Sequence, residues 1–398
     1  MKRRLTGGLM STGTSKAYWA ERALPSVFKH NLLGRYIPQF GGMTGSRDKQ
    51  VVYLDGYAGE GRYENGDSGS AEIAMKVASK HRSQHQLHWT CFFTEADAKS
   101  VAKLEQVADI YRRQGVDARV HHGDVDGVLR QVVSTAVGKP LFLFLDPCGL
   151  VLPYERLVGT LAARRRAGNW PPTEFLMNFS MDAVRRLGGN ARSAKGLEAS
   201  SLRFDQVMGG RWWREYFPAE REWDPDAAEK VAVAYAQRLG AATGMLVRSV
   251  PVFRAPHHRG AVYHLVFGTW RQHGLWVFGD TVARARDAWW QEVELADEAH
   301  DPNTLFTAAS LLRPDPKEVT EAAIPVIAKN LEQLLAQGRR PFRLVDHTLN
   351  VFGDYYGQVT EPAVRAAVKK LHAEAKTPTT GVSKGKEKIR DMVVVPAR

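Results

Sequence analysis

The chain has 398 residues and carries 55 Lys and Arg against 43 Asp and Glu, which gives a formal net charge of +12. Its length predicts roughly two or three domains, and its 44% hydrophobic and 25% charged residues are typical of a globular protein. Two cysteines are too few for a disulfide framework or a metal cluster held by four cysteines, which excludes a secreted mini-protein and an iron–sulfur enzyme and favours a cytoplasmic protein.

The positive charge indicates a polyanionic partner, because Lys and Arg that neutralise phosphates release counterions from nucleic acid. Part of the excess is local, since residues 376–398 hold six basic and two acidic side chains and so contribute +4 of the +12. The alternative is a solvated basic surface that serves solubility alone. A membrane partner is not expected, because the chain has no run of about 18 apolar residues.

Short apolar runs alternate with helical stretches in the first half of the chain. A flexible terminus (1–16), a helix (17–37) and a glycine-rich loop (41–46) are expected before them. Strands are predicted at 50–55, 87–94, 118–121, 141–146 and 174–179, and helices at about 70–80, 97–114, 124–136 and 153–166. This alternation is typical of a parallel sheet covered by helices.

A different pattern follows the fifth strand. Residues 183–244 are predicted to form a helical insertion, with strands at 245–253 and 261–270 and a helix at 275–298 after it. The link between these two strands is short enough for an antiparallel hairpin. Five parallel strands that end in a hairpin describe the seven-stranded, Rossmann-like sheet of the class I methyltransferases, so we expect an α/β domain of this fold over residues 17–300.

The C-terminal part is predicted to be a winged-helix-like domain over residues 315–398. Prolines mark its boundary, and helices are expected at 324–335, 344–355 and 361–376. A basic two-stranded ribbon is expected within 381–395. Helix, helix, helix and ribbon in this order are typical of a winged helix.

Basic side chains in this C-terminal part are candidates for nucleic-acid contact. The last helix presents a basic face to a groove, and the ribbon places lysines near phosphates. The residues expected to do so are Arg365, Lys369 and Lys370 on the helix and Lys384, Lys386 and Lys388 in the wing. A protein-contact domain with a solvated basic surface is the alternative.

The segment 51–63 carries the strongest functional signal. An apolar strand ends at Asp55 and continues into a loop with three glycines. Glycine lets a ligand approach the backbone, whose N–H groups can then bind it. We expect the loop to bind a nucleoside-type cofactor, and a purely structural turn is the alternative. The candidate cofactor-binding residues of this segment are Asp55, Gly56, Tyr57, Ala58, Gly59 and Gly61.

Acidic residues also follow the next two strands. Glu95 follows the second strand, at the place where open α/β folds hold ribose hydroxyls. Asp124, with Val125 beside it, follows the third strand and can accept a hydrogen bond from an adenine amino group. The alternative for either acid is a helix N-cap, and Asp124 is well placed for one. Three acids at three successive strand ends nevertheless favour a binding site.

The fourth strand delivers Asp146 to the carboxyl edge of the sheet, where Pro147 fixes the turn. The carboxylate of Asp146 is suited to polarise or deprotonate a methyl acceptor as that acceptor attacks the methyl group. Cys148 after proline suits a thiolate nucleophile, although filling a tight turn is the commoner role of such a cysteine. With Asn178 on the next strand, the expected catalytic group is Asp146, Pro147, Cys148 and Asn178. No set of residues has the spacing of a metal site.

These motifs resemble two families of methyltransferase. Similarity to the ribosomal-RNA adenine-N6 methyltransferases lies in Phe28-Lys29-His30, Tyr53-Leu54-Asp55, Ala58-Gly59, Gly61-Arg62-Tyr63 and Asp146-Pro147. Over most of residues 17–376 the chain more closely resembles the three-Cys-motif partner proteins, with which it shares Asp146-Pro147-x-Gly149, Asn178-Phe179-Ser180 and Tyr263-His264-Leu265-Val266-Phe267.

The resemblance implies S-adenosylmethionine as the cofactor and nucleic acid as the substrate. It places Asp55, Gly59 and Gly61 on the cofactor, Glu95 at the ribose and Asp124 at the adenine, and Lys29 and Asp146 complete the expected cofactor-binding set. The name of the second family implies a separate partner protein that resembles radical S-adenosylmethionine enzymes.

The chain departs from the amino-methyltransferase pattern after Asp146-Pro147. Those enzymes continue with a proline and an aromatic residue that stacks on the flipped base, whereas Cys148 and Gly149 stand here. Tyr57, Phe179 or Tyr154 would have to supply the aromatic face. The expected function is S-adenosylmethionine-dependent methylation of nucleic acid. The alternatives are a catalytically degenerate adaptor for nucleic acid or the partner protein, and a methyltransferase with a protein or small-molecule acceptor.

Overall fold

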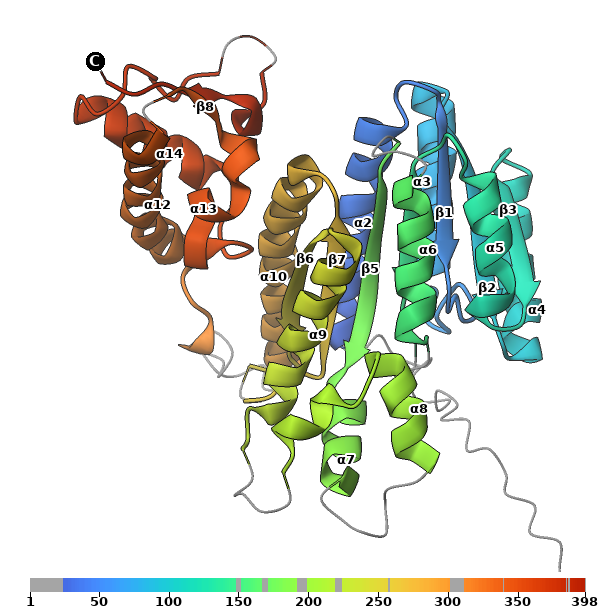
Figure 1. Ribbon diagram of the computed structural model, residues 1–398. Coiled ribbons are helices and arrows are strands. Elements are labelled where there is room, and N and C mark those ends of the chain that lie inside the picture. The colour runs from blue at the N-terminus through green and yellow to red at the C-terminus, as the bar shows by residue number, and fades with distance from the viewer. Residues whose placement is uncertain are drawn as a thin grey trace, which may run out of the picture.

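The fold is known from a computed structural model, which describes residues 24–147, 152–166, 171–191, 199–218, 224–256, 258–300, 311–338, 340–383, 385 and 387–397. A seven-stranded sheet lies between two layers of helices, and a smaller C-terminal module packs beside it (Figure 1). The expected flexible terminus 1–16 lies outside the described residues. No helix in the described ranges is both long and apolar enough to cross a membrane.

The order of the strands identifies the sheet. The strands are β1 (Gln50–Asp55), β2 (His88–Glu95), β3 (Asp117–His122), β4 (Leu141–Leu145), β5 (Thr173–Ser180), β6 (Leu246–Val252) and β7 (Tyr263–Thr269). They lie in the order β3-β2-β1-β4-β5-β7-β6, and only β7 is antiparallel to its neighbours. This is the sheet of the class I methyltransferases, so the predicted fold and the β6–β7 hairpin are confirmed.

Helices cover both faces of the sheet because its strands are apolar on both sides. One face is covered by α2 (Leu24–Thr44), α3 (Ser70–His85), α4 (Ala98–Arg112) and α10 (Gln272–His300). The other is covered by α5 (Val125–Thr135), α6 (Tyr154–Arg166), α7 (Met181–Ala191), α8 (Ala199–Met208), the 3₁₀ helix η1 (Trp212–Tyr216) and α9 (Ala227–Thr243). The last four occupy the segment predicted to be a helical insertion.

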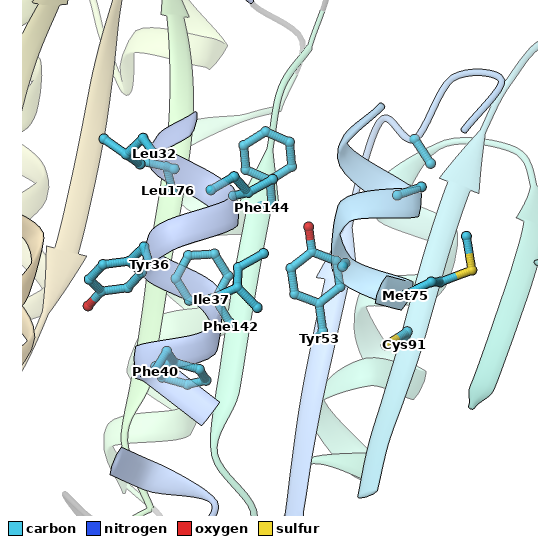
Figure 2. Close-up of a cluster of buried hydrophobic side chains, with 14 of the residues drawn as sticks. Leu32, Tyr36, Ile37, Phe40, Tyr53, Met75, Cys91, Phe142, Phe144 and Leu176 are labelled. Carbon is cyan, nitrogen blue, oxygen red and sulfur yellow. The ribbon is translucent and has the colours of Figure 1, made fainter. Parts of the chain in front are cut away.

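The core beneath α2 is aromatic. Figure 2 shows Tyr36 and Phe40 of α2 beside Phe142 of β4, whose ring centroid lies 5.8 and 5.3 Å from theirs. The ring of Tyr53 on β1 stacks against the same phenylalanine at 6.1 Å. Such pairs add to the stability that burial alone provides, so α2 is fixed against the centre of the sheet.

The loop predicted over 41–46 is wrong in its first half, because α2 continues to Thr44. A Cβ atom at Gly41 would lie 2.3 Å from Cζ2 of Trp89. Glycine therefore stands at this position to let the helix approach β2 closely, and it does not end the helix.

The C-terminal module contains α12 (Pro316–Gly338), β8 (Phe342–Arg343), η2 (Leu344–His347), α13 (Thr348–Phe352), η3 (Gly353–Tyr355), α14 (Glu361–Ala373), η4 (Ile389–Asp391) and β9 (Val393–Val394). The ribbon expected within 381–395 is wrong, since β9 pairs with β8, which precedes the second helix. The helix expected over 344–355 is broken into three short turns, and Gly353 has a φ of +53° within it. The winged-helix assignment stays a prediction.

Helix α10 joins the module to the sheet (Figure 1). Trp276 of α10 is fully buried in the core of the module, and its Nε1 donates a hydrogen bond to Oε1 of Glu361 at 2.8 Å. The Tyr356 hydroxyl of the module in turn donates to the Leu275 carbonyl of α10 at 2.6 Å. The neighbouring Val277 and Phe278 belong to the core under the sheet, so one turn of α10 serves both cores.

Glu174 is a buried carboxyl near the amino end of β5. It therefore lies at the other side of the sheet from the carboxyl ends of the parallel strands. It accepts hydrogen bonds from the Tyr36 hydroxyl at 2.6 Å and the Thr269 hydroxyl at 2.8 Å. Burial raises the pKa of Glu174 to about 7, more than these hydrogen bonds lower it. The folded protein therefore binds this proton more tightly than the unfolded chain, and stability falls as pH rises from the unfolded pKa through about 7.

We predict that Glu174→Gln removes this part of the pH dependence. Chemical denaturation of the wild type at pH 5 and pH 8 should show a loss of roughly 3 kcal/mol or less from this group, and the variant should show a smaller loss. The glutamine NH₂ can donate to Tyr36, whose hydroxyl also lies 3.3 Å from the Gly274 carbonyl. Exposed Glu318→Gln is the control, and an equal slope in both variants would contradict the assignment.

Candidate active site at the carboxyl edge of the sheet

The loop after β1 is held to the strands on both sides of it. The Gly56 N–H donates to the Phe144 carbonyl on β4 at 2.9 Å, and the Ala58 N–H donates to the Thr94 carbonyl on β2 at 2.9 Å. Because β1 is the strand at which the sheet order reverses direction, this loop lies at the topological switch point, where open α/β sheets bind ligands.

Glycines shape this loop in two ways. Gly59 and Gly61 have φ values of +59° and +81°, in the left-handed region that favours glycine. Gly56 instead provides space, since a Cβ atom there would lie 2.9 Å from Cγ2 of Val125 and 3.0 Å from Cδ2 of Leu145. Val125, a predicted cofactor residue, is therefore buried against the loop.

Asp55 fixes the loop from below. It is fully buried, and its Oδ1 accepts from the Tyr57 N–H at 3.1 Å while Oδ2 accepts from the Ser70 hydroxyl at 2.6 Å. Burial raises the pKa of Asp55 to about 7 against the lowering effect of these hydrogen bonds. The geometry makes Asp55 a residue that ties the glycine loop to the first turn of α3.

Glu95 reaches the loop from the end of β2. Its Oε2 accepts from the Gly59 N–H at 2.9 Å, and its Oε1 accepts from the Asp97 N–H at 2.9 Å. A carboxylate oxygen can accept more than one hydrogen bond, so each oxygen retains acceptor capacity. The structure thus brings Glu95 and the glycine loop together, as the sequence predicts.

Asp124 caps a helix. It is the N-cap of α5, and its Oδ1 accepts from the Gly127 N–H at 3.1 Å. The capping alternative is therefore realised, and the side chain is exposed. An adenine contact by the same residue stays a prediction.

Asp146, Lys29 and Asn178 form a polar cluster that spans α2, the end of β4 and β5. The Lys29 Nζ pairs with Asp146 Oδ2, and their side chains are only 4% and 15% exposed. The Asn178 Nδ2 donates to Asp146 Oδ1 at 2.7 Å. Three residues predicted from separate motifs, 117 and 32 positions apart, are thus in direct contact.

This contact settles the orientation of the Asn178 amide. The carboxylate requires a donor, so the nitrogen faces Asp146 and the Oδ1 atom points away from it. That Oδ1 is buried and has no hydrogen-bond partner in the described part of the chain. A buried acceptor without a donor is rare, so this oxygen is available to a donor from outside the chain.

Tyr53 is a second polar group of this kind, and we did not predict it from the sequence. Its ring is in the aromatic core (Figure 2), and its buried hydroxyl has no hydrogen-bond partner among the described residues. Burial raises the pKa of Tyr53 above the usual range, and the nearby charges of Asp55 and Asp146 act in the same direction. Its sequence signals are its place in the Tyr53-Leu54-Asp55 motif and its position two residues before Asp55, on the same face of β1.

The other residues predicted for catalysis or stacking make no contact of this kind. Pro147 is buried beside Asp146, and Cys148 lies outside the described residues. Two of the three candidates for stacking on a base are buried in the core beneath α6 and α9. Phe179 and Tyr154 pack there against Tyr235, with ring centroids 4.8 and 5.7 Å away, and have no free aromatic face to offer. Tyr57, which is half-buried, stays a candidate.

The predicted nucleic-acid residues lie in the C-terminal module. Lys369 and Lys370 are exposed on α14, Arg365 is half-buried, and Lys388 precedes η4. Lys384 and Lys386 are outside the described residues. In Figure 1 the module lies beside α10 near the amino edge of the sheet, away from the strand ends that carry Asp146.

Comparisons with other proteins do not identify a family, since neither a family model nor a curated protein matches the chain. Among solved structures, the small RNA methyltransferase HEN1 matches at 8% identity and a TM-score of 0.31, over 59% of this chain and 25% of that one. The methyltransferase domain of bacterial CtHen1 matches at 12% identity and a TM-score of 0.31, over 61% and 99%. A putative caffeoyl-CoA O-methyltransferase from Staphylococcus aureus matches at 9% identity and a TM-score of 0.30, over 58% and 80%. At such scores it is the strand order that identifies the fold.

We predict strong energetic coupling between Lys29 and Asp146. Removing one partner of a buried ion pair leaves the other charge uncompensated, which costs roughly 3–5 kcal/mol. Lys29→Met should therefore destabilise the wild type by about 3 kcal/mol, and the Asp146→Asn background by less than half of that. Urea denaturation of the four proteins in this double-mutant cycle measures the difference.

Lys103→Met is the matched control, because Lys103 pairs with Glu60 at 2.7 Å and its side chain is 52% exposed. Its effect should be below about 1 kcal/mol. Equal destabilisation by Lys29→Met in both backgrounds would contradict the coupling.

Proposed function

We propose that this protein is an S-adenosylmethionine-dependent methyltransferase of the three-Cys-motif partner type that acts on nucleic acid. The observation that carries the proposal is the arrangement at the switch point. A glycine loop bonded to Glu95 stands on one side, and Asp146 with the unpartnered Asn178 Oδ1 stands on the other. The loop side suits a nucleoside cofactor. The Asp146 side suits a methyl acceptor that donates hydrogen bonds.

The described residues fit the cofactor. Its ribose carries two hydroxyl donors, and Glu95 has acceptor capacity on both oxygens. The left-handed glycines leave the loop backbone open to the methionine end. When bound, S-adenosylmethionine supplies an electrophilic methyl group on a sulfonium. Asp55 contributes indirectly, by holding the loop in place.

The acceptor side suits a group that carries hydrogen. Asn178 Oδ1 and Asp146 are both hydrogen-bond acceptors, so together they can orient an amine or hydroxyl and polarise its bond to hydrogen. Lys29 positions Asp146 and offsets its charge. The exocyclic amine of a nucleobase has the required donors, and half-buried Tyr57 is the candidate for stacking on the base. Alignment of the acceptor is the main contribution we expect from these residues.

We predict that the protein binds S-adenosylhomocysteine and that Glu95→Gln weakens this binding about tenfold or more. Glutamine keeps the shape of the side chain but loses one acceptor for the ribose hydroxyls. Isothermal titration calorimetry measures the affinity, and circular dichroism verifies the fold. Exposed Glu318→Gln should bind like the wild type. Absence of binding by folded wild-type protein would contradict the proposed function.

The nucleic-acid substrate is supported by basic side chains on α14. In the described part of the chain Lys370 pairs with Glu374 at 2.7 Å, whereas Lys369 and Arg365 have no ion pair. Charges without a protein partner are available to phosphates. We predict that the double variant Lys369→Gln/Arg365→Gln lowers the slope of log affinity against log salt for RNA or DNA by about 1–2.

Fluorescence anisotropy over a salt series measures this slope for a labelled oligonucleotide. Exposed Lys80→Gln on α3 is the control and should leave the slope unchanged. If the wild type shows no salt-dependent binding to RNA or DNA, the nucleic-acid substrate is contradicted and the methyl acceptor is a protein or a small molecule.

A second function, a catalytically inactive adaptor, is favoured by one observation. Lys29 already occupies Asp146 Oδ2, so this carboxylate is partly satisfied within the chain. In that case the sheet would bind nucleic acid or a separate radical-type partner without methyl transfer. A methylation assay with labelled cofactor separates the two, because activity that Asp146→Asn abolishes supports the enzyme, and cofactor binding without transfer supports the adaptor.

A further inference from the structure

Two cavities lie where α2 and α10 meet the C-terminal module. The first has a volume of about 540 Å³ and lies between α2, α10, the start of α12 and residues 358–360. The second has a volume of about 420 Å³ and lies between α2, α10, the start of α14 and residues 388–390. Arg35 and Arg284 line both cavities, so the two are neighbours with a shared wall.

Cations outnumber acids in the lining of these cavities. The cations are Arg35, Arg284, Arg286 and Arg313 in the first cavity and Arg35, Arg284, Lys388 and Arg390 in the second. The acids are Asp287 in the first cavity and Asp280 and Glu361 in the second. Nothing in the proposed methyl transfer uses these groups.

Some of the arginines have acidic partners and others do not. Arg284 pairs with Asp280 at 2.8 Å, and Arg313 pairs with Glu294 at 2.7 Å and with Asp287. The side chains of Arg35, which is exposed, and Arg286, which is half-buried, form neither a hydrogen bond nor an ion pair within the described ranges. The Nε atom of Arg286 is buried without a partner, and burial lowers the pKa of Arg286.

Arg390 shows a smaller deficit in the second cavity, since one of its nitrogens donates to the Met43 Sδ at 3.6 Å and only its Nε is unsatisfied. Its buried Nε has no hydrogen-bond partner in the part of the chain that the structure describes, and its acidic neighbours Glu361 and Asp391 lie 3.6 and 4.0 Å away. These distances are too long for good hydrogen bonds. Arg286 and Arg390 thus have unsatisfied nitrogens in two adjoining cavities.

A buried arginine elsewhere in the fold shows how the chain satisfies such a group when the role is structural. Arg164 also lacks an acidic partner among the residues that the structure describes, but it donates to the Thr173 hydroxyl at 2.9 Å and to the carbonyls of Ala136 and Lys139 at 2.7 and 2.8 Å. Burying a guanidinium without such partners is unfavourable. The contrast indicates that Arg286 is completed by a group from outside the chain.

We propose that these adjoining cavities are a binding site for a phosphate-bearing ligand, with Arg35 and Arg286 as its principal contacts. The planar guanidinium forms paired hydrogen bonds with phosphate oxygens, and two unpaired arginines on one cavity match a dianion. The ligand is either the backbone of a polynucleotide or a free phosphorylated compound, since both present the same group.

The position of the site favours the polynucleotide. Arg35 follows Lys29 on α2 by about 9 Å along the helix axis, and Lys388, a predicted phosphate contact, lines the second cavity. The cavities therefore lie between the cluster around Asp146 and the basic residues of the C-terminal module. A bound phosphate here would connect two regions that are otherwise separated by α10.

The test is thermal denaturation of the full chain with inorganic pyrophosphate, compared with sodium chloride at the same ionic strength. Wild-type protein should show a higher Tm in pyrophosphate, because a ligand that binds only the folded state stabilises it. Arg286→Gln and Arg35→Gln should lose most of this rise. Arg113→Gln, which removes an exposed charge after α4, should keep it. No rise in the wild type, or an equal rise in all four proteins, overturns the site.

A second measurement identifies the source of the phosphate and is independent of methyl transfer. If the ligand is a polynucleotide, Arg286→Gln should weaken binding of a single-stranded oligonucleotide about fivefold, and pyrophosphate should compete with the oligonucleotide on the wild type. Loss of the pyrophosphate effect with unchanged oligonucleotide affinity instead supports a free phosphorylated compound. Retained binding of S-adenosylhomocysteine by Arg286→Gln shows that the variant is folded, so this site and the cofactor site are tested separately.

Discussion

The buried pair of Lys29 and Asp146 fixes the position of α2, and much of the molecule depends on that position. The ammonium contacts the end of β4, lies 5.8 Å over the Tyr263 ring of β7, and through Asp146 is connected to Asn178 on β5. Any sliding of α2 along the sheet would separate charges that have little access to water, which is costly. The helix therefore has one register, and the aromatic contacts beneath it follow from that register.

Two kinds of acid stand at the carboxyl edge. Asp55 is buried under the loop, with a donor on each oxygen, so it stabilises the shape of the loop, and a direct contact with a cofactor stays a prediction. A carboxyl whose pKa is near 7 exists in both forms near neutral pH, and in either form it can bond to a hydroxyl such as that of Ser70. Glu95 holds the other end of the loop and is left half-exposed. Asp55 thus stabilises the loop, and Glu95 is the carboxyl proposed to contact the ligand.

The sequence was sufficient for the strands and for the acids that follow them. Apolar runs bounded by turn residues locate strands well, and each of the seven predicted strands of the main sheet lies within two residues of its observed bounds. Strand ends in a parallel sheet share one edge, so Asp55, Glu95 and Asp146 could be placed together without coordinates. Contacts between distant segments were not accessible in this way. The partner of Lys29, the pairing of β9 with β8 and the close approach at Gly41 depend on packing, which local periodicity does not encode.

The distribution of positive charge also could not be predicted from the sequence alone. The sequence locates a basic excess near the C-terminus. It does not indicate that Arg35 lines one cavity with Arg286 and the adjoining cavity with Arg390. Those cavities are walled by α2 and α10, which pack side by side, and by the module into which Trp276 inserts. An anion bound between them would favour the closed packing of all three parts. Because α2 also carries Lys29, such an anion would act on the same helix that positions Asp146.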